Sequence, residues 1–246
     1  LRECVAFSGA LAAALALACV RPRRVRWRDA LRAAARAGAD AVPIVCILGF
    51  LMGLIIAFQA AIPMSKLGAE IYVADLVGVA TLRELGPLVT CVILAGRTGS
   101  AFAAEIGTMR VNEELDALRA MGLDPVAFLA VPRVLAVLAV TPPLALFANL
   151  TGIVGAIVVL LSMGYPLSAC LNETLSMLRP GDLAGGLLKA LVFGLIVAAI
   201  GCLRGLQTRD GPDAVGVSAT RAVVGGIILI VIADGLFAVL FHCLKI

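Results

Sequence analysis

The sequence predicts an all-α integral membrane protein: an N-terminal interfacial helix, then five transmembrane helices, with a short polar cytoplasmic helix between spans two and three. The first observation is composition, because 62% of the 246 residues are hydrophobic and only 15% are charged, whereas about a quarter of a soluble domain is charged. The second is that the apolar residues fall in runs of about 20, the length that crosses a bilayer. The third is that one polar segment, residues 95–125, interrupts these runs. The length fits a single domain over residues 1–246, with an interfacial region at 1–40 and a five-span core at 42–246.

The N-terminal apolar stretch, residues 5–20, is short for a transmembrane span and is followed by a basic run, Arg21–Arg36. A signal peptide has the opposite order, with its positive charge before the apolar run and a cleavage site after it. We therefore expect a helix that lies in the cytoplasmic interface and is held against anionic lipid by the basic run. A first true span is the alternative.

Longer apolar stretches predict the five transmembrane helices. The third contains Pro142 and Pro143, which should kink it. Fourteen of the twenty Lys and Arg residues fall on one side of the membrane if the basic run, the segment 97–133 and the segment 204–221 lie there together. By the positive-inside rule that side is cytoplasmic, so the N-terminus is cytoplasmic and the C-terminus is external. The expected spans are residues 42–62, 72–94 or slightly beyond, 134–161, 183–203 and 222–244.

Small residues recur at helical spacing in and near these spans, a pattern that lets helices approach closely. For each of them, ordinary packing within one chain and contact between two copies are equally good explanations. The residues are Gly49 and Gly53, Gly181 and Gly185, Gly201 and Gly205, and a ladder of Ala95, Gly99, Ala103 and Gly107.

The segment between spans two and three carries the start and stop signals of a helix of about nine residues. Asn112 is a favourable N-cap, and acidic residues follow it in the first turn, where the helix dipole favours negative charge. Gly122 suits the C-terminal end and Pro125 stops propagation. An apolar stripe would face the membrane domain, leaving an acidic face toward water or a partner. The stripe consists of Val111, Leu115, Leu118 and Met121.

Two explanations of this helix remain open: a solvated loop helix, or a peg onto which a soluble motor docks. A connection between two spans needs only a few residues, and this one uses some thirty, from 95 to 125, which favours docking. The motor is not within this sequence, because a phosphate-binding loop ends in Gly-Lys-Ser or Gly-Lys-Thr and none of Lys66, Lys189 and Lys245 stands in that pattern. Any ATPase must therefore be another polypeptide.

Three stretches resemble the signature of the MlaE/YrbE permease family: "RELGP" (83–87), "GRTGSAFAAEIGTMRVNEELDALRAMGLDP" (96–125) and "GPDAVGVSATRAVV" (211–224). The resemblance covers essentially the whole chain. In the last stretch, similar proteins often have Gly-Val-Gly and Ala-Thr-Thr where this chain has Ala214-Val215-Gly216 and Ser218-Ala219-Thr220.

The resemblance implies a homodimeric permease subunit of an ABC system in the bacterial inner membrane, with its C-terminus in the periplasm. Such systems move phospholipids or related lipids between that membrane and another envelope compartment. The implied partners are a cytoplasmic ATPase that binds ATP and Mg²⁺, a periplasmic MCE-domain protein and, in many systems, a STAS-domain protein. No cofactor is expected in this chain itself. The polar helix would be the coupling helix, and Arg221 would lie in a cytoplasmic loop. The expected coupling residues are Glu105, Arg110, Glu113, Glu114, Asp116 and Arg119.

Ionisable residues inside the predicted spans are the candidate lipid-pathway residues, because each costs roughly 2.5–3.5 kcal/mol at mid-bilayer. Arg83 and Glu84 are adjacent in span two and point about 100° apart, so they cannot both face one partner. Together with Lys189 and Asp234, they would either line a polar cavity that contacts a lipid head group or form an ion-pair network that only fixes helix packing. Asp182 is expected to cap the N-terminus of span four.

Two other function classes are weaker: an intramembrane enzyme that modifies lipids or cleaves proteins, and a passive channel or scaffold. The sequence contains neither HExxH nor GxSxG, and its only histidine is His242, so we assign no catalytic and no metal-binding residues. The seven cysteines are scattered singly, which suits apolar filler rather than a redox or metal site. No nucleic-acid partner is expected.

Overall fold

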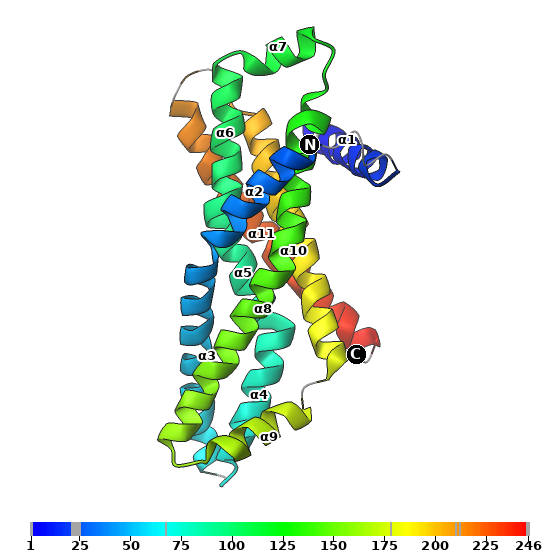
Figure 1. Ribbon diagram of the computed structural model, residues 1–246. Helices are drawn as coiled ribbons and strands as arrows, with labels where there is room; N and C mark the ends of the chain where they lie inside the picture. Colours follow the sequence, from blue (N-terminus) through cyan, green and yellow to red (C-terminus); the bar gives the residue numbers. More distant parts are fainter. Residues whose placement is uncertain are drawn as a thin grey trace. The chain divides into compact units, whose positions relative to one another are not determined.

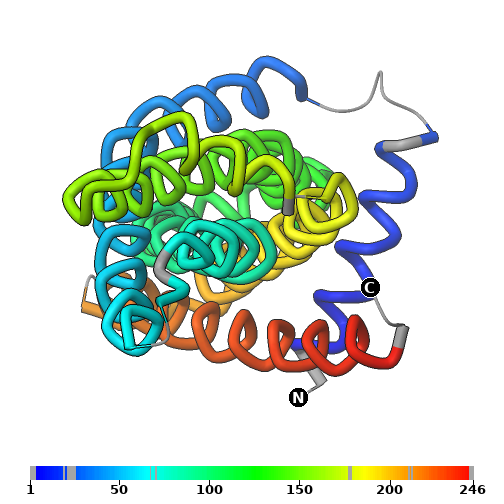
Figure 2. The backbone as a smooth tube through the Cα atoms, turned by 90° about the horizontal axis from the view of Figure 1, so that it is seen from below, coloured from blue at the N-terminus to red at the C-terminus, as the bar shows by residue number. Residues whose placement is uncertain are grey.

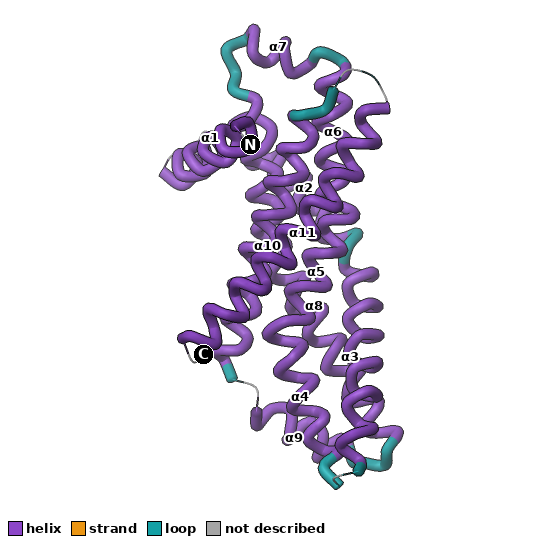
Figure 3. Tube along the Cα trace, turned by 180° about the vertical axis from the view of Figure 1, so that it is seen from behind, coloured by secondary structure: helices purple, strands orange, loops and turns teal. Residues whose placement is uncertain are grey.

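The computed structural model describes residues 2–20, 26–66, 68–177, 179–209, 211 and 213–244 (Figure 1). Every regular element in these ranges is helical (Figure 3). Five helical runs are long and apolar enough to cross a membrane, and a shorter apolar helix precedes them. The all-α fold with five spans and a short N-terminal helix is therefore confirmed. The five runs are Trp27–Ser65, Val73–Val111, Val126–Ser162, Pro180–Leu206 and Asp213–Cys243.

The individual helices follow the expected order, with short π-helical and 3₁₀ turns between some of them (Figure 1). The first half of the chain contains α1 (Arg2–Val20), α2 (Trp27–Ala39), α3 (Val42–Ser65), the 3₁₀ turn Glu70–Tyr72, α4 (Val73–Ala80), the π turn Thr81–Leu85, α5 (Gly86–Leu94), the π turn Ala95–Gly99 and α6 (Ser100–Val111). The second half contains α7 (Glu114–Ala120), the π turn Val126–Ala130, α8 (Val131–Ser162), α9 (Leu167–Met177), α10 (Pro180–Leu206) and α11 (Asp213–Leu244).

Two predicted details differ from the structure, and a third is untested. The helical run of span two continues to Val111 instead of ending near residue 94, because Ala, Phe, Ile and Met carry the helix through the segment where charges had suggested a loop. Helix α9 was not predicted, because its eleven residues mix polar and apolar side chains without a clear period. Helix α8 continues through Pro142 and Pro143; the kink expected there stays a prediction.

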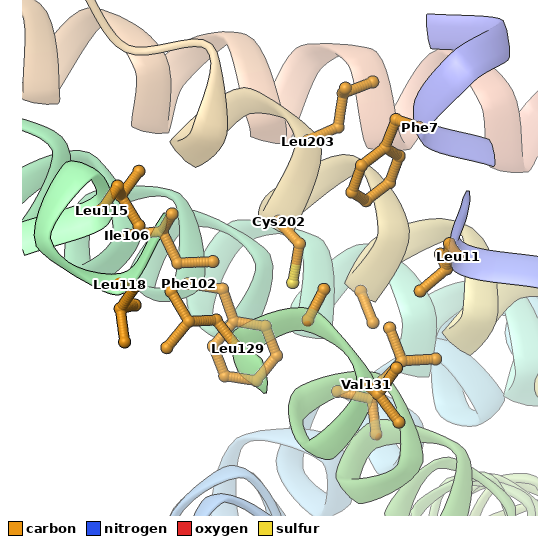
Figure 4. Close-up of a cluster of buried hydrophobic side chains, with 14 residues drawn as sticks. Phe7, Leu11, Phe102, Ile106, Leu115, Leu118, Leu129, Val131, Cys202 and Leu203 are labelled. Atoms are coloured by element: carbon orange, nitrogen blue, oxygen red, sulfur yellow. The ribbon is translucent and has the colours of Figure 1, made fainter. Parts of the chain in front are cut away.

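The chain divides into two compact units. Unit 1 comprises Leu1–Ala39, Cys91–Val140 and Val192–Ile232, and unit 2 comprises Asp40–Thr90, Thr141–Leu191 and Ala233–Ile246. In unit 1, α1 packs against the π turn Val126–Ala130, and α7 packs against α6. Figure 4 shows the apolar core of this unit, in which side chains from α1, α6, α7, α8 and α10 meet.

Unit 2 has its own apolar core. There α4 packs against α3 and α9 (Figures 1 and 2), and the core includes Val77, Leu160 and the buried Cys170. Glycines bring α3 directly onto α8: a Cβ added at Gly53 would lie 1.9 Å from the carbonyl oxygen of Gly152. For Gly49 and Gly53, packing within one chain is thus the explanation that the structure supports.

We predict that Gly53→Ala will lower stability by about 1–3 kcal/mol, the usual cost of overpacking, because the new methyl group must displace backbone. The matched control is Gly235→Ala, where an added Cβ meets nothing within 4 Å. Thermal unfolding of the purified protein in detergent measures both. Equal melting temperatures for the two variants would contradict the close α3–α8 contact.

Candidate functional site

The strongest candidate site is a cluster of charged side chains in unit 2. The Lys189 ammonium on α10 donates hydrogen bonds to Glu84 Oε2 at 2.5 Å and to Asp234 Oδ1 at 3.0 Å. Lys189 is fully buried, whereas the side chains of Glu84 and Asp234 are 39% and 22% exposed. The structure therefore brings together three of the four residues that the sequence had singled out in the spans. A buried ammonium needs such partners, because an unpaired charge in a low-dielectric interior costs several kcal/mol.

Local backbone geometry explains how Lys189 reaches Glu84. Glu84 lies in the π turn Thr81–Leu85, a wider helical turn of the kind that often occurs at functional sites. Helix α10 approaches this turn closely at Gly186, where an added Cβ would lie 2.0 Å from the carbonyl oxygen of Leu82. Lys189 follows Gly186 by three residues and so lies near the same face of α10. The missing side chain at Gly186 thus lets the ammonium approach the carboxylate.

Arg83 forms a second ion pair. Its Nη1 lies 3.2 Å from Asp182 Oδ1 in the first turn of α10, so adjacent residues of the π turn have different partners, as their angular separation requires. The expected N-cap role of Asp182 is wrong in detail. Asp182 is the third residue of α10, and its other oxygen accepts a hydrogen bond from the Arg179 amide at 3.3 Å, which is the reach-back half of a capping box.

Phe241 contacts both the Lys189 network and the Arg83–Asp182 pair. Sequence reasoning missed this residue. Its ring centroid lies 5.5 Å from the Lys189 ammonium and 5.9 Å from the Arg83 guanidinium, both within cation–π range. Phe241 follows Asp234 by seven residues, which is two helical turns and therefore the same face of α11. That spacing is the signal that could have identified it.

The cluster consists of two partly exposed carboxylates paired with one buried ammonium. This arrangement is not a catalytic set of residues. The three-residue network carries one positive and two negative formal charges, a net charge of −1, and the Arg83–Asp182 pair beside it is neutral. In the described residues, no group of three or more His, Cys, Asp or Glu side chains could hold a metal ion. The arrangement is suited to binding a polar group by charge-assisted hydrogen bonds.

The polar segment forms α7, and its apolar side is anchored in unit 1. Leu115 and Leu118 are buried in the core, as Figure 4 shows, beside Ile106 and Phe102. Met121 is 66% exposed, so the predicted stripe is shorter than expected. The predicted stripe does not include Met121, because α7 ends at Ala120, one residue earlier.

The cap predicted for this helix is also wrong. Asn112 is the C-terminal capping residue of α6, and Glu113 is the N-cap of α7, without a side-chain hydrogen bond to the helix. Glu113 has φ of +59°, a left-handed conformation that is uncommon outside glycine. The helix is seven residues long instead of about nine, because Glu113 takes the capping position at its start and Met121 takes it at its end.

The six expected coupling residues are not equivalent in the structure. Glu113, Glu114 and Asp116 are exposed, and Arg119 pairs with Asp116 at 3.0 Å on the same helix. Glu105 lies on α6 instead, where its carboxylate is 3.0 Å from Arg133 of α8. The guanidinium of Arg133 also lies over the ring of Phe102.

A cavity of about 800 Å³ in unit 1 brings Arg110, Arg119 and Arg221 together. Sequence reasoning placed Arg110 and Arg119 together in the coupling set and Arg221 in a cytoplasmic loop. The loop assignment is wrong, because α11 begins at Asp213 and includes Arg221. Sequence reasoning used Arg204 and Arg209 only in counting cytoplasmic charge, and both line the same cavity.

We predict that Lys189→Met will destabilise the protein by about 3–5 kcal/mol, because it leaves two carboxylates facing an apolar side chain. The charge-free variant Glu84→Gln/Lys189→Met/Asp234→Asn should recover most of that loss, and the exposed Lys66→Met serves as the control. Unfolding in detergent is the measurement. If Lys189→Met unfolds like the wild-type protein, the pairing seen here does not hold the helices.

Comparison with known proteins agrees with this architecture. The profile of a family described as permease MlaE matches residues 30–240. A probable ABC transporter permease protein of Rickettsia prowazekii is 38% identical over 205 residues, which are 83% of this chain and 79% of that protein. One of Synechocystis sp. is 38% identical over 213 residues, 86% of this chain and 81% of that protein.

A plant protein is also similar. The chloroplastic Arabidopsis thaliana protein named TRIGALACTOSYLDIACYLGLYCEROL 1 is 35% identical over 214 residues, covering 86% of this chain and 61% of that protein. The resemblance seen in the sequence is thereby confirmed. This chain belongs to the MlaE permease family and is the multi-pass membrane subunit of an ABC transporter, in which ATP hydrolysis belongs to a separate ATPase subunit.

Proposed function

We propose that the protein is the permease of an ATP-driven lipid transporter that moves phospholipids between the bacterial inner membrane and a periplasmic MCE-domain protein. The observation that carries the proposal is the polar cluster of Glu84, Lys189 and Asp234. Its lysine is buried, and its two carboxylates are partly exposed. The neighbouring surface of α10 and α11 is apolar, with Leu188, Leu236 and Val239 exposed. An amphiphile has the same two requirements, a polar contact for its head and an apolar wall for its tails.

The relatives support lipid as the cargo class. The Arabidopsis protein carries the name of a galactosylated diacylglycerol. A passive channel or scaffold would have no need of an ATPase, so membership in an ABC permease family disfavours that alternative. An intramembrane enzyme would need a nucleophile, base or metal set, and the cluster pairs its ions with one another instead.

The alternative that the ion network only fixes helix packing explains the burial of Lys189 but not the exposure of its partners. Within a membrane span, a carboxylate that serves packing alone is best enclosed by protein, because a charge that faces hydrocarbon is costly. Glu84 keeps more than a third of its side chain exposed. We therefore assign Glu84, Lys189, Asp234 and Arg83 to the lipid pathway, with Phe241 added by its contacts.

To couple ATP hydrolysis to transport, we propose that the ATPase binds the exposed acidic face of α7. Leu115 and Leu118 fix α7 in the core of unit 1, so a force on the helix passes into that core instead of bending a loose loop. The Glu105–Arg133 pair then ties α6 to α8. In this proposal the α7 side is cytoplasmic, the N-terminus is cytoplasmic and the C-terminus is periplasmic.

The remaining assembly follows from the same proposal. Two copies of this chain form the transport unit, two ATPase copies supply the sites for ATP and Mg²⁺, and a STAS-domain protein attaches in systems that have one. The long exposed apolar face of α11, which includes Val224, Ile228 and Leu236, suits contact with lipid or with a second copy. The proposal includes no cofactor in this chain and no nucleic acid.

We expect the charge-free variant Glu84→Gln/Lys189→Met/Asp234→Asn to fold but to transfer lipid about tenfold more slowly, because the head group loses its charged contacts. Transfer of fluorescent phospholipid from proteoliposomes to the purified MCE protein, with ATP present, is the assay. Conversely, wild-type transfer by this variant would leave the network with a packing role only.

Reversing Glu113, Glu114 and Asp116 to Lys should uncouple the complex while the chain remains folded, because the three side chains are exposed and the anchoring leucines are untouched. We expect lipid-dependent ATPase activity to fall by about tenfold, which is about 1.4 kcal/mol of coupling energy. Asp213→Lys, exposed elsewhere on the same unit, is the control for added positive charge. Undiminished ATPase activity in the triple variant would remove α7 as the docking element.

A further inference from the structure

Unit 1 contains a cavity of about 800 Å³ whose charged lining is entirely cationic. Arg110 comes from α6, Arg119 from α7, and Arg204 from α10, and the cavity wall also includes Arg209 and Arg221. Two hydroxyl groups, of Thr208 and Ser218, complete the polar lining and hydrogen-bond to each other at 2.9 Å. Guanidinium groups and hydroxyls are the donors that bind phosphate oxygens.

These arginines are poorly neutralised within the part of the chain that the structure describes. Arg119 pairs with Asp116 at 3.0 Å, and Arg204 Nη1 donates to the uncharged Gln207 at 3.3 Å. The Nε of Arg204 is buried and has no acceptor there. A buried guanidinium donor without an acceptor is costly, so the site is suited to an anion.

An apolar groove of about 610 Å³ adjoins this cavity, and the two share Phe7, Leu203 and Arg204. The groove lies between α1, α10 and α11, and its lining residues all belong to unit 1. Figure 4 shows Phe7 on α1 beside Leu203 on α10. Its remaining lining is almost entirely apolar, including Leu11, Ile200 and Leu229. A ligand that fills both spaces must have an anionic head and a hydrocarbon chain.

We propose that this composite site binds an anionic glycerophospholipid from the surrounding bilayer, with its phosphate in the arginine cavity and an acyl chain in the groove. A free phosphate ion or an acidic segment of a partner would leave the groove empty, whereas a diacyl lipid uses both parts. The site is separate from the Glu84, Lys189 and Asp234 network, which belongs to unit 2 and offers carboxylate acceptors to a donor group of a lipid head instead of donors to its phosphate.

The lipid would connect helices that are far apart in the sequence. Its acyl chain would lie against α1, and its head would contact Arg119 on α7, the proposed docking helix. Bound lipid therefore holds α1 and α7 to the α10–α11 side of unit 1.

The test measures lipid binding directly and does not depend on transport. The transporter complex is reconstituted into nanodiscs of phosphatidylcholine with a minor fraction of phosphatidylglycerol, extracted gently, and examined by native mass spectrometry. We expect Arg204→Gln/Arg209→Gln to lower retained phosphatidylglycerol by about tenfold, as expected for loss of two charge-assisted contacts. Neither residue belongs to the proposed coupling set. Lys66→Gln/Arg179→Gln, at two exposed residues of unit 2, makes the same charge change outside the cavity and should retain the lipid.

Two further variants separate the alternatives. Arg209→Gln/Arg221→Gln changes only exposed residues, so it gives the same readout if Arg204 proves necessary for folding. Gly225→Leu fills the groove, since Gly225 lines it and an added Cβ has room; we expect it to reduce retained phosphatidylglycerol as well.

Three results would overturn the proposal. One is wild-type retention of phosphatidylglycerol by both Arg204→Gln/Arg209→Gln and Arg209→Gln/Arg221→Gln. Another is unchanged retention by Gly225→Leu, which would reduce the site to binding of a free anion. The third is loss of the ATPase subunit from the arginine variants with lipid binding unchanged, which would assign the cavity to an acidic segment of that partner.

Discussion

The buried ammonium of Lys189 is the constraint on which the arrangement of unit 2 depends. A fully enclosed positive charge must have anionic partners, and here they come from the π turn before α5 and from α11. That requirement explains why Gly186 brings α10 against the backbone at Leu82, and why the turn that carries Glu84 is widened. The same pairing leaves two carboxylates partly open in an otherwise apolar setting. In the function proposed above, packing and ligand binding use the same charges.

Much of the fold could be predicted from the sequence, because long apolar runs have few alternatives to membrane-spanning helices. The spans were located to within a few residues where an apolar run ends in charge, as at Val42 or Leu244. They were misplaced where helix-forming residues continue past the charge, as in α6. Helix α9 and the corner at Asn112 and Glu113 depend on tertiary packing and on one left-handed residue, which local propensity does not encode.

The candidate sites, like the fold, were only partly predictable from the sequence. The intramembrane charges were identifiable singly because each is costly in lipid. Their pairing was not predictable, because it depends on which faces of α10 and α11 meet. The clustering of Arg204 with Arg110 and Arg221 likewise arises from helices distant in the sequence. A periodicity within one helix cannot reveal a neighbour on another.

The direct backbone contact of Gly53 with Gly152 has a mechanical consequence. Where two helices touch without intervening side chains, neither can rotate about its own axis without driving a side chain into the other, so α3 and α8 move as one piece. Within unit 2, the C-terminal part of α11 contacts α10 differently, through the long side chain of Lys189 reaching Asp234 and through the ring of Phe241. Four rotatable bonds lie between the lysine backbone and its ammonium. Unit 2 therefore combines a rigid contact between α3 and α8 with a flexible side-chain contact to α11. Displacing α11 costs less energy than displacing α3 relative to α8.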